Sequence, residues 1–395
     1  AEWSDAEFLR RVCQWVVPHM DFSRGGWWII DDTGFPKKGV HSVGVARQYC
    51  GMLGKQDKCQ VAVSVSLACD QGSIPVAWQL YLPQDWAQDA ERRKRTGVPE
   101  SVRFATKTQI ALHQLRTLLS EGAPRHCVLA DAGYGVDTAF RQALSDMGLH
   151  YAVGVTSAVV VWPPGVEPLP PETYSGKGRP PVTPRRTAQL QPMSVKALAL
   201  SLPAQAFQTI SWRAGTNAPL TGRFAAVRVR HAGGNAGKAS LRPQEWLLIE
   251  WPVEQAEPVK YILSTLPEST ALNDLVSCAY QRWRIERDYQ DLKQDFGLGH
   301  YEGRGWRGFH HHASLSIAAY AFLMSERLIA DKPAGGKKNF IERQVPAVPQ
   351  DYIPRGRPAR TAARGQLDHK LASSAELRTH RPSGTVPLLR PHQHE

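Results

Sequence analysis

Two short apolar segments, each ending in a carboxylate, limit the fold of this chain more than any other feature. Residues 27 to 32 read WWIIDD before glycines and a proline, and residues 127 to 131 read CVLAD before Ala132-Gly133. Short apolar runs bounded in this way are typical of buried strands. Because neighbouring parallel strands end at the same edge of a sheet, the pattern predicts two aspartates close together at strand tips. Strand side chains alternate between faces, so only one of Asp31 and Asp32 can join such a site.

The segments around these two runs alternate between strand and helix patterns. Residues 60 to 67 and 74 to 82 predict a hairpin, since apolar residues alternate on both sides of an Asp-Gln-Gly-Ser turn. Helical spacing at 110 to 119, a helix capped by Asp137 and an apolar run at 150 to 155 follow. The resulting order β-β-β-α-β-α-β mixes antiparallel and parallel pairing. We therefore expect an α/β fold with a mixed sheet and flanking helices.

Composition changes beyond residue 157 and predicts further domains. Prolines interrupt the start of this region, and short strand patterns then follow at 207 to 213, 223 to 230 and 245 to 251. Helical patterns resume at Ala271 to about Phe296 and at Ala313 to Leu328. The predicted domains are the remnant of an N-terminal helical region (1–26), the first part of the core (27–157), a β-rich insertion (158–265), the closing helices of the core (266–330) and a basic, proline-rich flexible tail (331–395).

Charge and cysteine content narrow the class of protein. The 48 Lys and Arg residues exceed the 36 Asp and Glu residues, which gives a formal charge of +12 and favours a polyanionic partner. The six cysteines form no CxxC pair, so we expect reduced thiols rather than structural zinc. The longest mostly apolar stretch is shorter than the roughly 20 residues that a membrane span needs. We expect a soluble protein.

A later helix carries a third carboxylate beside basic residues. At about 100° per residue, one face of this helix combines Arg282, Glu286, Tyr289 and Lys293. Three carboxylates can hold two hard divalent ions while neighbouring cations hold phosphates, as in-line displacement at a phosphodiester requires. Taken alone, Glu286 is more simply an i, i+4 partner of Arg282, and each aspartate a turn former. The order and spacing of all three favour a metal site.

This helix resembles the signature helix of insertion-sequence transposases of the DDE class, which have an RNase H-like fold. Their third acid lies in a Tyr-x2-Arg-x3-Glu-x6-Lys pattern, and Arg282, Glu286 and Lys293 fit that spacing within an Arg-Trp-x-Ile-Glu context. The tyrosine departs from the pattern, because Ala279 takes its place and Tyr280 comes one residue later. Any role of that tyrosine in the family is therefore not carried over to this chain.

Other segments resemble the same family over roughly residues 1 to 330. The stretch IIDDTGFPKKG is similar to the first-acid motif and favours Asp32 over Asp31, and VLADAGYG is similar to the second-acid strand with Asp131. The stretches SGKGRPP and DYQDLKQDFGL resemble one subgroup of these transposases. The family also implies a β-rich insertion between the second acid and the glutamate, where the strand patterns place one.

The resemblance implies a cut-and-paste transposase that binds the inverted-repeat ends of its element, cleaves them with metal-activated water and joins the freed 3'-hydroxyl to target DNA. It implies that two Mg2+ ions, replaceable by Mn2+, are held by Asp32, Asp131 and Glu286. Arg282 and Lys293 would then position the phosphate backbone. The expected partner is double-stranded DNA, bound by a homodimer on paired ends without a membrane. The expected location is the bacterial cytoplasm, in association with the nucleoid.

Further basic and aromatic residues are candidates for contact with DNA. The pair Trp212-Arg213 is suited to stacking on an unpaired base, although packing within a β domain explains it equally well. Basic runs are suited to phosphate contacts but usually form solvated surface. The candidates are Lys177, Arg179, Arg185, Arg186, Trp212, Arg213 and Trp306, together with the run Arg92-Arg93-Lys94-Arg95.

Two other functions fit the same residues. The chain starts without methionine, and its tail after about Arg360 departs from the family, so a truncated, catalytically silent DNA-binding regulator of such an element is one alternative. The other is a general metal-dependent nuclease without preference for element ends. Cleavage of end-bearing DNA, compared with other DNA, separates these functions.

Overall fold

The computed structural model describes residues 3–330, except 168, 179, 182–184, 186, 188–189, 214–218 and 233–241. The chain divides into two units, Ala1–Pro333 and Ala334–Glu395, and all described residues belong to the first. The predicted tail, 331–395, lies outside the described residues.

Five strands form the central sheet in the order β4-β3-β1-β5-β6. Strand β1 pairs antiparallel with β3 and parallel with β5, while β5 pairs parallel with β6 and β3 antiparallel with β4. This mixed sheet with flanking helices confirms the predicted RNase H-like α/β class. The strands are β1 (Trp27–Pro36), β3 (Lys55–Cys69), β4 (Gly72–Leu80), β5 (Cys127–Ala130) and β6 (Tyr151–Val155).

Strand β1 is longer than the sequence predicts, so the two aspartates lie within it rather than at its tip. Residues 33–36 remain paired with β3 because the first part of β3 is long enough to match them. The pairing of β1 with β5, in contrast, ends at Ile30 and Ala130. The apolar half of β1 is covered on both faces, and Trp28, Ile29 and Ile30 are fully buried. The edge of the sheet at which the aspartates were expected is therefore formed by the end of β5 and not by the end of β1.

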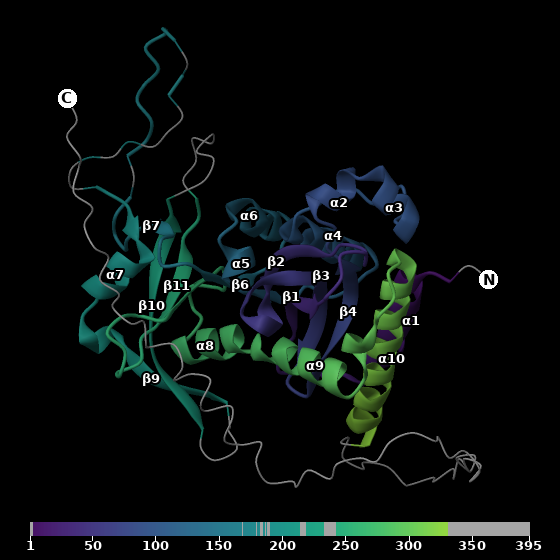
Figure 1. The fold of residues 1–395 in the computed structure, drawn as a ribbon. Coiled ribbons are helices and arrows are strands. Elements are labelled where there is room, and N and C mark those ends of the chain that lie inside the picture. Colours follow the sequence, from purple (N-terminus) through teal and green to yellow (C-terminus); the bar gives the residue numbers. More distant parts are fainter. Residues whose placement is uncertain are drawn as a thin grey trace, which may run out of the picture. The chain divides into compact units, whose positions relative to one another are not determined.

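Helices cover both faces of this sheet (Figure 1). On one face α4 contacts β3, where Gln114 donates to the carbonyl oxygen of Val63. On the other face α9 contacts the same strand one residue later, since the hydroxyls of Tyr289 and Ser64 are hydrogen-bonded at 2.8 Å. The helices are α1 (Asp5–Val16), α4 (Lys107–Ser120), α6 (Thr138–Asp146), α9 (Trp283–Gln294) and α10 (Trp306–Ala330).

Helix α10 begins earlier than the sequence predicts and is a core helix. It packs against α1 and β4, and it buries a row of side chains that includes Phe309, Ile317 and Met324. By length and composition alone it could cross a membrane, with a mean hydropathy of 1.2 in its most apolar window, but 44% of that window is buried inside the protein. One such helix is weak evidence for a membrane span.

The strands of the region 158–265 extend the central sheet. Strand β12 pairs antiparallel with β6, and the sheet continues from β12 through β11, β10 and β7 to β8. The sequence reasoning missed β12 and α7, because both are short and lie among turn residues. The elements are β7 (Val160–Trp162), β8 (Met193–Ser194), α7 (Val195–Ser201), β9 (Gln208–Arg213), β10 (Leu220–His231), β11 (Glu245–Glu250) and β12 (Lys260–Ser264).

The prediction of one continuous helix from Ala271 to about Phe296 is wrong, because the structure has two helices in this range. The range is divided into α8 (Leu272–Tyr280) and α9, with Gln281 and Arg282 between them. At the break the amide of Arg284 bonds the carbonyl of Gln281, three residues back, so the chain tightens instead of continuing the α-helical ladder. This break turns the side chain of Arg282 toward β1.

Several short elements complete the described part of the fold. They are β2 (Ala46–Cys50), α2 (Gln84–Gln88), α3 (Ala90–Thr96), α5 (Ala132–Gly135), and 3-10 turns at Val17–His19, Gly51–Leu53, Ala204–Ala206 and Leu298–His300. Strand β2 pairs with the first residues of β3, and α2 and α3 follow β4.

Candidate active site

Asp31 and Asp131 are brought side by side by the register of two parallel strands. The pairing of β1 with β5 runs from Trp27↔Cys127 to Ile30↔Ala130, so the next residue on each strand is an aspartate. Adjacent strands lie about 4.8 Å apart. The chain turns away after Ala130, and the Asp131 carboxylate caps α5 by accepting from the amide of Gly133 at 2.9 Å. Two carboxylates therefore share the edge where β5 ends.

Two glycines allow this close approach. A Cβ atom at Gly135 of α5 would lie 1.9 Å from the carbonyl oxygen of Gly154 on β6. A Cβ atom at Gly154 would lie 2.9 Å from the amide nitrogen of Ala132. Glycine at both positions lets α5 lie directly on β6. This packing fixes the position of Asp131, the residue that caps the start of α5.

Arg282 links the strand aspartate to the helix glutamate. Its guanidinium donates to Asp31 Oδ2 at 2.8 Å and to Glu286 Oε1 at 2.8 Å. Asp131 lies close enough to act electrostatically on both Arg282 and Asp31. The three carboxylates of Asp31, Asp131 and Glu286 are thus gathered around one cation.

The pKa values at this site reflect burial and crowding. The pKa of Asp31 is raised to about 7, mainly by burial; the charge of Arg282 opposes this rise and the charge of Asp131 adds to it. Burial lowers the pKa of Arg282, but the surrounding carboxylates outweigh burial and the net direction is upward. Glu286 is different, because 63% of its side chain is exposed. The site therefore has a buried floor and an open side.

Asp32, which the sequence reasoning preferred, lies on the opposite face of β1. Its carboxylate accepts from Lys107 of α4 at 3.0 Å and from the hydroxyl of Tyr134 at 3.4 Å. Alternation directs Asp31 toward α9 and Asp32 toward α4, so Asp31, and not Asp32, lies on the face of β1 that meets Arg282. Lys107 and Tyr134 were missed; no sequence spacing connects them to β1, since both contacts are long-range.

Tyr289 and Lys293, predicted on the same helix face as Glu286, hold the helix on the sheet. Tyr289 is buried, and its hydroxyl bonds Ser64, the residue paired with Asp31 across β1 and β3. The ammonium of Lys293 donates to the carbonyl oxygen of Gly34 at 2.9 Å, and burial lowers its pKa to about 8. Both residues fix α9 against the strand that carries Asp31.

A divalent cation suits the donor set of this site. Carboxylate oxygens are the ligands that Mg2+ prefers, and one guanidinium balances only part of the charge of Asp31, Asp131 and Glu286. Within the described ranges, no group of three or more His, Cys, Asp or Glu side chains is arranged to hold a metal ion. Arg282 pairs with Asp31 and with Glu286 instead. The predicted set Asp32, Asp131 and Glu286 is divided between the two faces of β1.

The basic candidates for DNA contact in the region 158–265 differ in exposure and in the elements that they contact. Lys177 and Arg185 are exposed, and Arg185 Nε donates to the carbonyl oxygen of Pro170 at 3.1 Å. Arg179 and Arg186 lie outside the described residues. Arg213 lies against α9, where its guanidinium is 4.0 Å from the centroid of the Trp283 ring. Arg213 is thus next to the residue that follows Arg282.

The two tryptophans among these candidates are packing residues. Trp212 is half-buried and contacts Tyr280 and Phe224, with ring centroids 4.6 Å and 5.6 Å apart. The contacts of Trp212 are therefore packing contacts with other aromatic side chains. The structure places Trp306 in the core, where its side chain is only 9% exposed and its ring contacts His310.

Comparison with known proteins gives one family and one curated relative. A family model described as DDE superfamily endonuclease matches residues 1–219. A protein named as the probable transposase for insertion sequence element IS701, from Microchaete diplosiphon, is 34% identical over 130 residues. The match spans 33% of this chain and 31% of the relative, so this chain covers about a third of that protein.

Among solved structures, the NurA nuclease from Sulfolobus solfataricus is a distant match. It is 8% identical, with 83% of this chain and 91% of that chain covered and a TM-score of 0.27. A likeness at this score supports no argument about fold or activity.

Proposed function

Since the chain belongs to the DDE superfamily of endonucleases, we propose that it is the transposase of an insertion sequence. It would cut DNA at the inverted-repeat ends of its element and join them to target DNA. The observation that supports this proposal is the convergence of Asp31, Asp131 and Glu286 on Arg282, from β1, the end of β5 and α9. The name of the curated relative supports the element-specific part.

We propose Asp31, Asp131 and Glu286 as the residues that would hold two Mg2+ ions, which Mn2+ would replace. When bound, such ions supply an activated oxygen nucleophile and stabilise the leaving oxygen of an in-line displacement. Asp31 accepts the Asp32 amide on Oδ1 and keeps Oδ2 toward Arg282, and Asp131 is oriented by the Gly133 amide. These backbone contacts fix both carboxylates before a ligand arrives.

Arg282 and Lys293 would position the scissile strand. Arg282 pairs with Glu286 on the open side of the site. A phosphate that enters there can replace the Glu286 carboxylate as the partner of Arg282. Lys293 places an ammonium at the backbone of Gly34, three residues beyond Asp31 on β1. Both cations act by binding and orienting phosphates.

The proposed partner is double-stranded DNA, both element ends and target. Arg213, beside Trp283 on α9, would contact it near the acids, and the exposed Lys177 and Arg185 would contact its phosphates elsewhere. Paired ends need two active sites, so we propose a homodimer on DNA. A protein with this role would act in the bacterial cytoplasm, at the nucleoid.

The proposal is tested by Mg2+-dependent cleavage of DNA that carries the ends flanking the gene, against random DNA of equal length. We expect the wild type to cut end DNA preferentially and Glu286→Gln to lose the activity. Glu268→Gln is the matched control, because Glu268 is an exposed carboxylate on the turn between β12 and α8. Equal cutting of both DNAs would support a general nuclease, and binding without cutting a silent regulator.

A further inference from the structure

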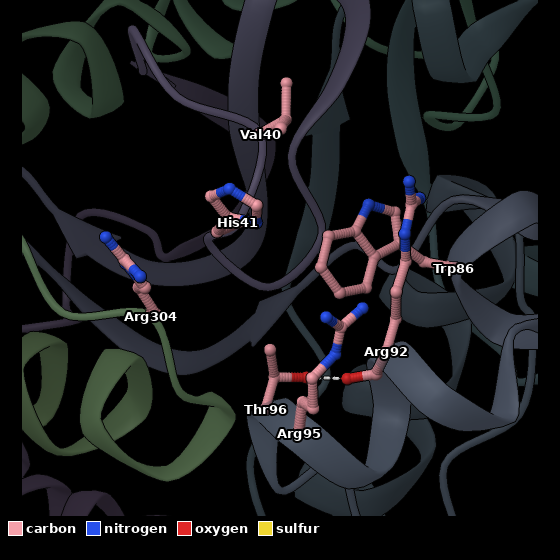
Figure 2. A pocket seen from close by; sticks show the side chains of 7 residues that line it. All are labelled: Val40, His41, Trp86, Arg92, Arg95, Thr96 and Arg304. Carbon is pink, nitrogen blue, oxygen red and sulfur yellow. Dashed lines mark hydrogen bonds between the residues drawn. The ribbon is translucent and has the colours of Figure 1, made fainter.

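A pocket separate from the acidic residues lies among arginines. Its volume is about 360 Å³, and it is lined by Val40, His41, Trp86, Arg92, Arg95, Thr96 and Arg304. Figure 2 shows Arg92 and Arg95 on one side of this pocket and His41 and Arg304 on the other. No carboxylate belongs to its lining. We call it the arginine pocket.

The walls of the arginine pocket continue from the two elements that carry catalytic acids. Val40 and His41 belong to the loop after β1, and Arg304 belongs to the loop after α9. These loops are joined, since the amide of Val43 donates to the carbonyl oxygen of Arg304 at 3.0 Å. A second link runs from the ammonium of Lys37 to the carbonyl oxygen of Tyr301 at 2.5 Å.

The third wall, α2 and α3, is tied to the same loop. The indole nitrogen of Trp86 donates to the carbonyl oxygen of Val45 at 2.7 Å. Thr96 bonds back to the carbonyl oxygen of Arg92 at 2.7 Å, a contact drawn in Figure 2. The arrangement of the pocket therefore follows from backbone contacts and does not depend on a ligand.

The positive charge of the pocket is only partly balanced by the protein itself. Arg92 stacks on the Trp86 ring at 5.0 Å and pairs with Asp89 at 3.3 Å. Within the described part of the chain, neither Arg95 nor Arg304 forms an ion pair. Basic side chains in the last turn of α3 are stabilised by the negative end of the helix dipole, which explains why some of them are there. This explanation does not cover Arg304, because Arg304 lies in a loop after α9. Two exposed guanidinium groups from separate elements thus face one space.

We propose that the arginine pocket binds a phosphate of the DNA backbone, away from the scissile bond; this rests on the proposed function. Guanidinium groups pair with phosphate oxygens through two parallel hydrogen bonds, and here they come from opposite walls. A base is a poorer fit, because Trp86 is 2% exposed and Arg92 covers its face. The pocket reads the backbone and carries no sequence preference.

The rest of β1 lies between the arginine pocket and the acids. Pro36 is five positions beyond Asp31, which at about 3.3 Å per residue is roughly 17 Å along the strand. The loop that contributes Val40 and His41 to the pocket begins at the next residue. The phosphate bound in the pocket is therefore a different one from the scissile phosphate.

The test measures DNA affinity against salt, in the Glu286→Gln background so that no cutting occurs. The double variant Arg95→Gln, Arg304→Gln should lower affinity equally for end DNA and random DNA, and reduce the slope of log affinity against log salt by about 1. Lys94→Gln is the matched control, because Lys94 is an exposed cation on α3 that does not line the pocket. Equal losses in the control and the double variant would overturn the proposal.

A scan with single methylphosphonate substitutions locates the contact. One neutralised phosphate, other than the scissile one, should weaken binding by the protein with an intact pocket and leave binding by the double variant unchanged. If no position behaves in this way, the pocket does not hold DNA, and its occupant is another anion. Failure of the proposed function would be visible separately, as intact end DNA after incubation with the wild type.

Discussion

The hydrogen bond between Tyr280 and Glu250 ties the strands of the region 158–265 to the helix before Arg282. The Tyr280 hydroxyl donates to Glu250 Oε2 at 2.5 Å, and burial, followed by Glu250, raises the pKa of Tyr280 far above its usual value. The hydroxyl therefore remains a donor over the working pH range. Glu250 is only 9% exposed, so it has little water to replace this donor.

Tyr280→Phe should lower the free energy of unfolding by about 2 kcal/mol, the worth of a hydrogen bond to a charged acceptor. The ring stays, and with it the contacts to Trp212 and to Lys260, whose ammonium lies 4.9 Å from the Tyr280 ring centroid. The substitution thus isolates the hydroxyl. Urea unfolding followed by tryptophan fluorescence measures the change.

Tyr261→Phe is the matched control, because the Tyr261 hydroxyl on β12 is buried and has no hydrogen-bond partner in the described structure. Its removal should leave stability unchanged within about 0.5 kcal/mol or raise it slightly. Equal losses for the two variants would refute the reasoning, since the loss would then not come from the bond to Glu250.

Three further predictions concern the site and its support. Gly135→Ala should destabilise the protein by about 3 kcal/mol in a urea titration, because its Cβ would meet a backbone oxygen, whereas Gly39→Ala, with open space around it, should be neutral; equal effects would contradict the packing argument. Burial lowers the pKa of His310, which accepts from the Leu80 amide as a neutral ring, so the unfolded state binds its proton more readily below about pH 6.5. Stability should therefore fall more steeply from pH 7 to pH 5 in the wild type than in His310→Gln, and parallel curves would exclude this cause. Removal of divalent ions with EDTA should abolish DNA cleavage, and Mg2+ or Mn2+ should restore it; cleavage in EDTA would contradict a metal-dependent site.

The strands around the acids could be predicted because each of them has a local signal in the sequence. Apolar runs bounded by glycine and proline mark β1 and β5, and period-two alternation marks the hairpin of β3 and β4. The parallel register that aligns Ile30 with Ala130 could not be predicted, because it depends on how two distant segments meet. The expected closeness of two aspartates therefore holds, although β1 does not end at them.

The choice between Asp31 and Asp32 shows the limit of local reasoning. Alternation established that one aspartate only could join Glu286, but the face that each takes depends on which helix covers which side. That is decided by contacts far apart in the sequence, Arg282 with Asp31 and Lys107 with Asp32. The resemblance of IIDDTGFPKKG to the first-acid motif favoured Asp32, but a local motif carries no information about which helix covers which face.

The break between α8 and α9 was missed for a related reason. The helical pattern runs through Gln281 without a glycine or proline, so the sequence predicts one helix. The contacts on either side of the break, from Tyr280 to Glu250 and from Arg282 to Asp31, are long-range. The burial of Trp306 could not be predicted either, because an aromatic residue beside arginine is typical of a surface, whereas the first turn of α10 buries it.

Metal-dependent cleavage of end DNA by Asp31→Asn and Asp32→Asn, compared with the wild type, decides which aspartate of β1 belongs to the active site. If Asp31 is the strand carboxylate of the site, Asp31→Asn should lose more than about 100-fold in rate. Asp32→Asn, whose carboxylate faces Lys107 on the other side of β1, should stay within about tenfold of the wild type. An intact rate for Asp31→Asn with a loss in Asp32→Asn would contradict the proposed site.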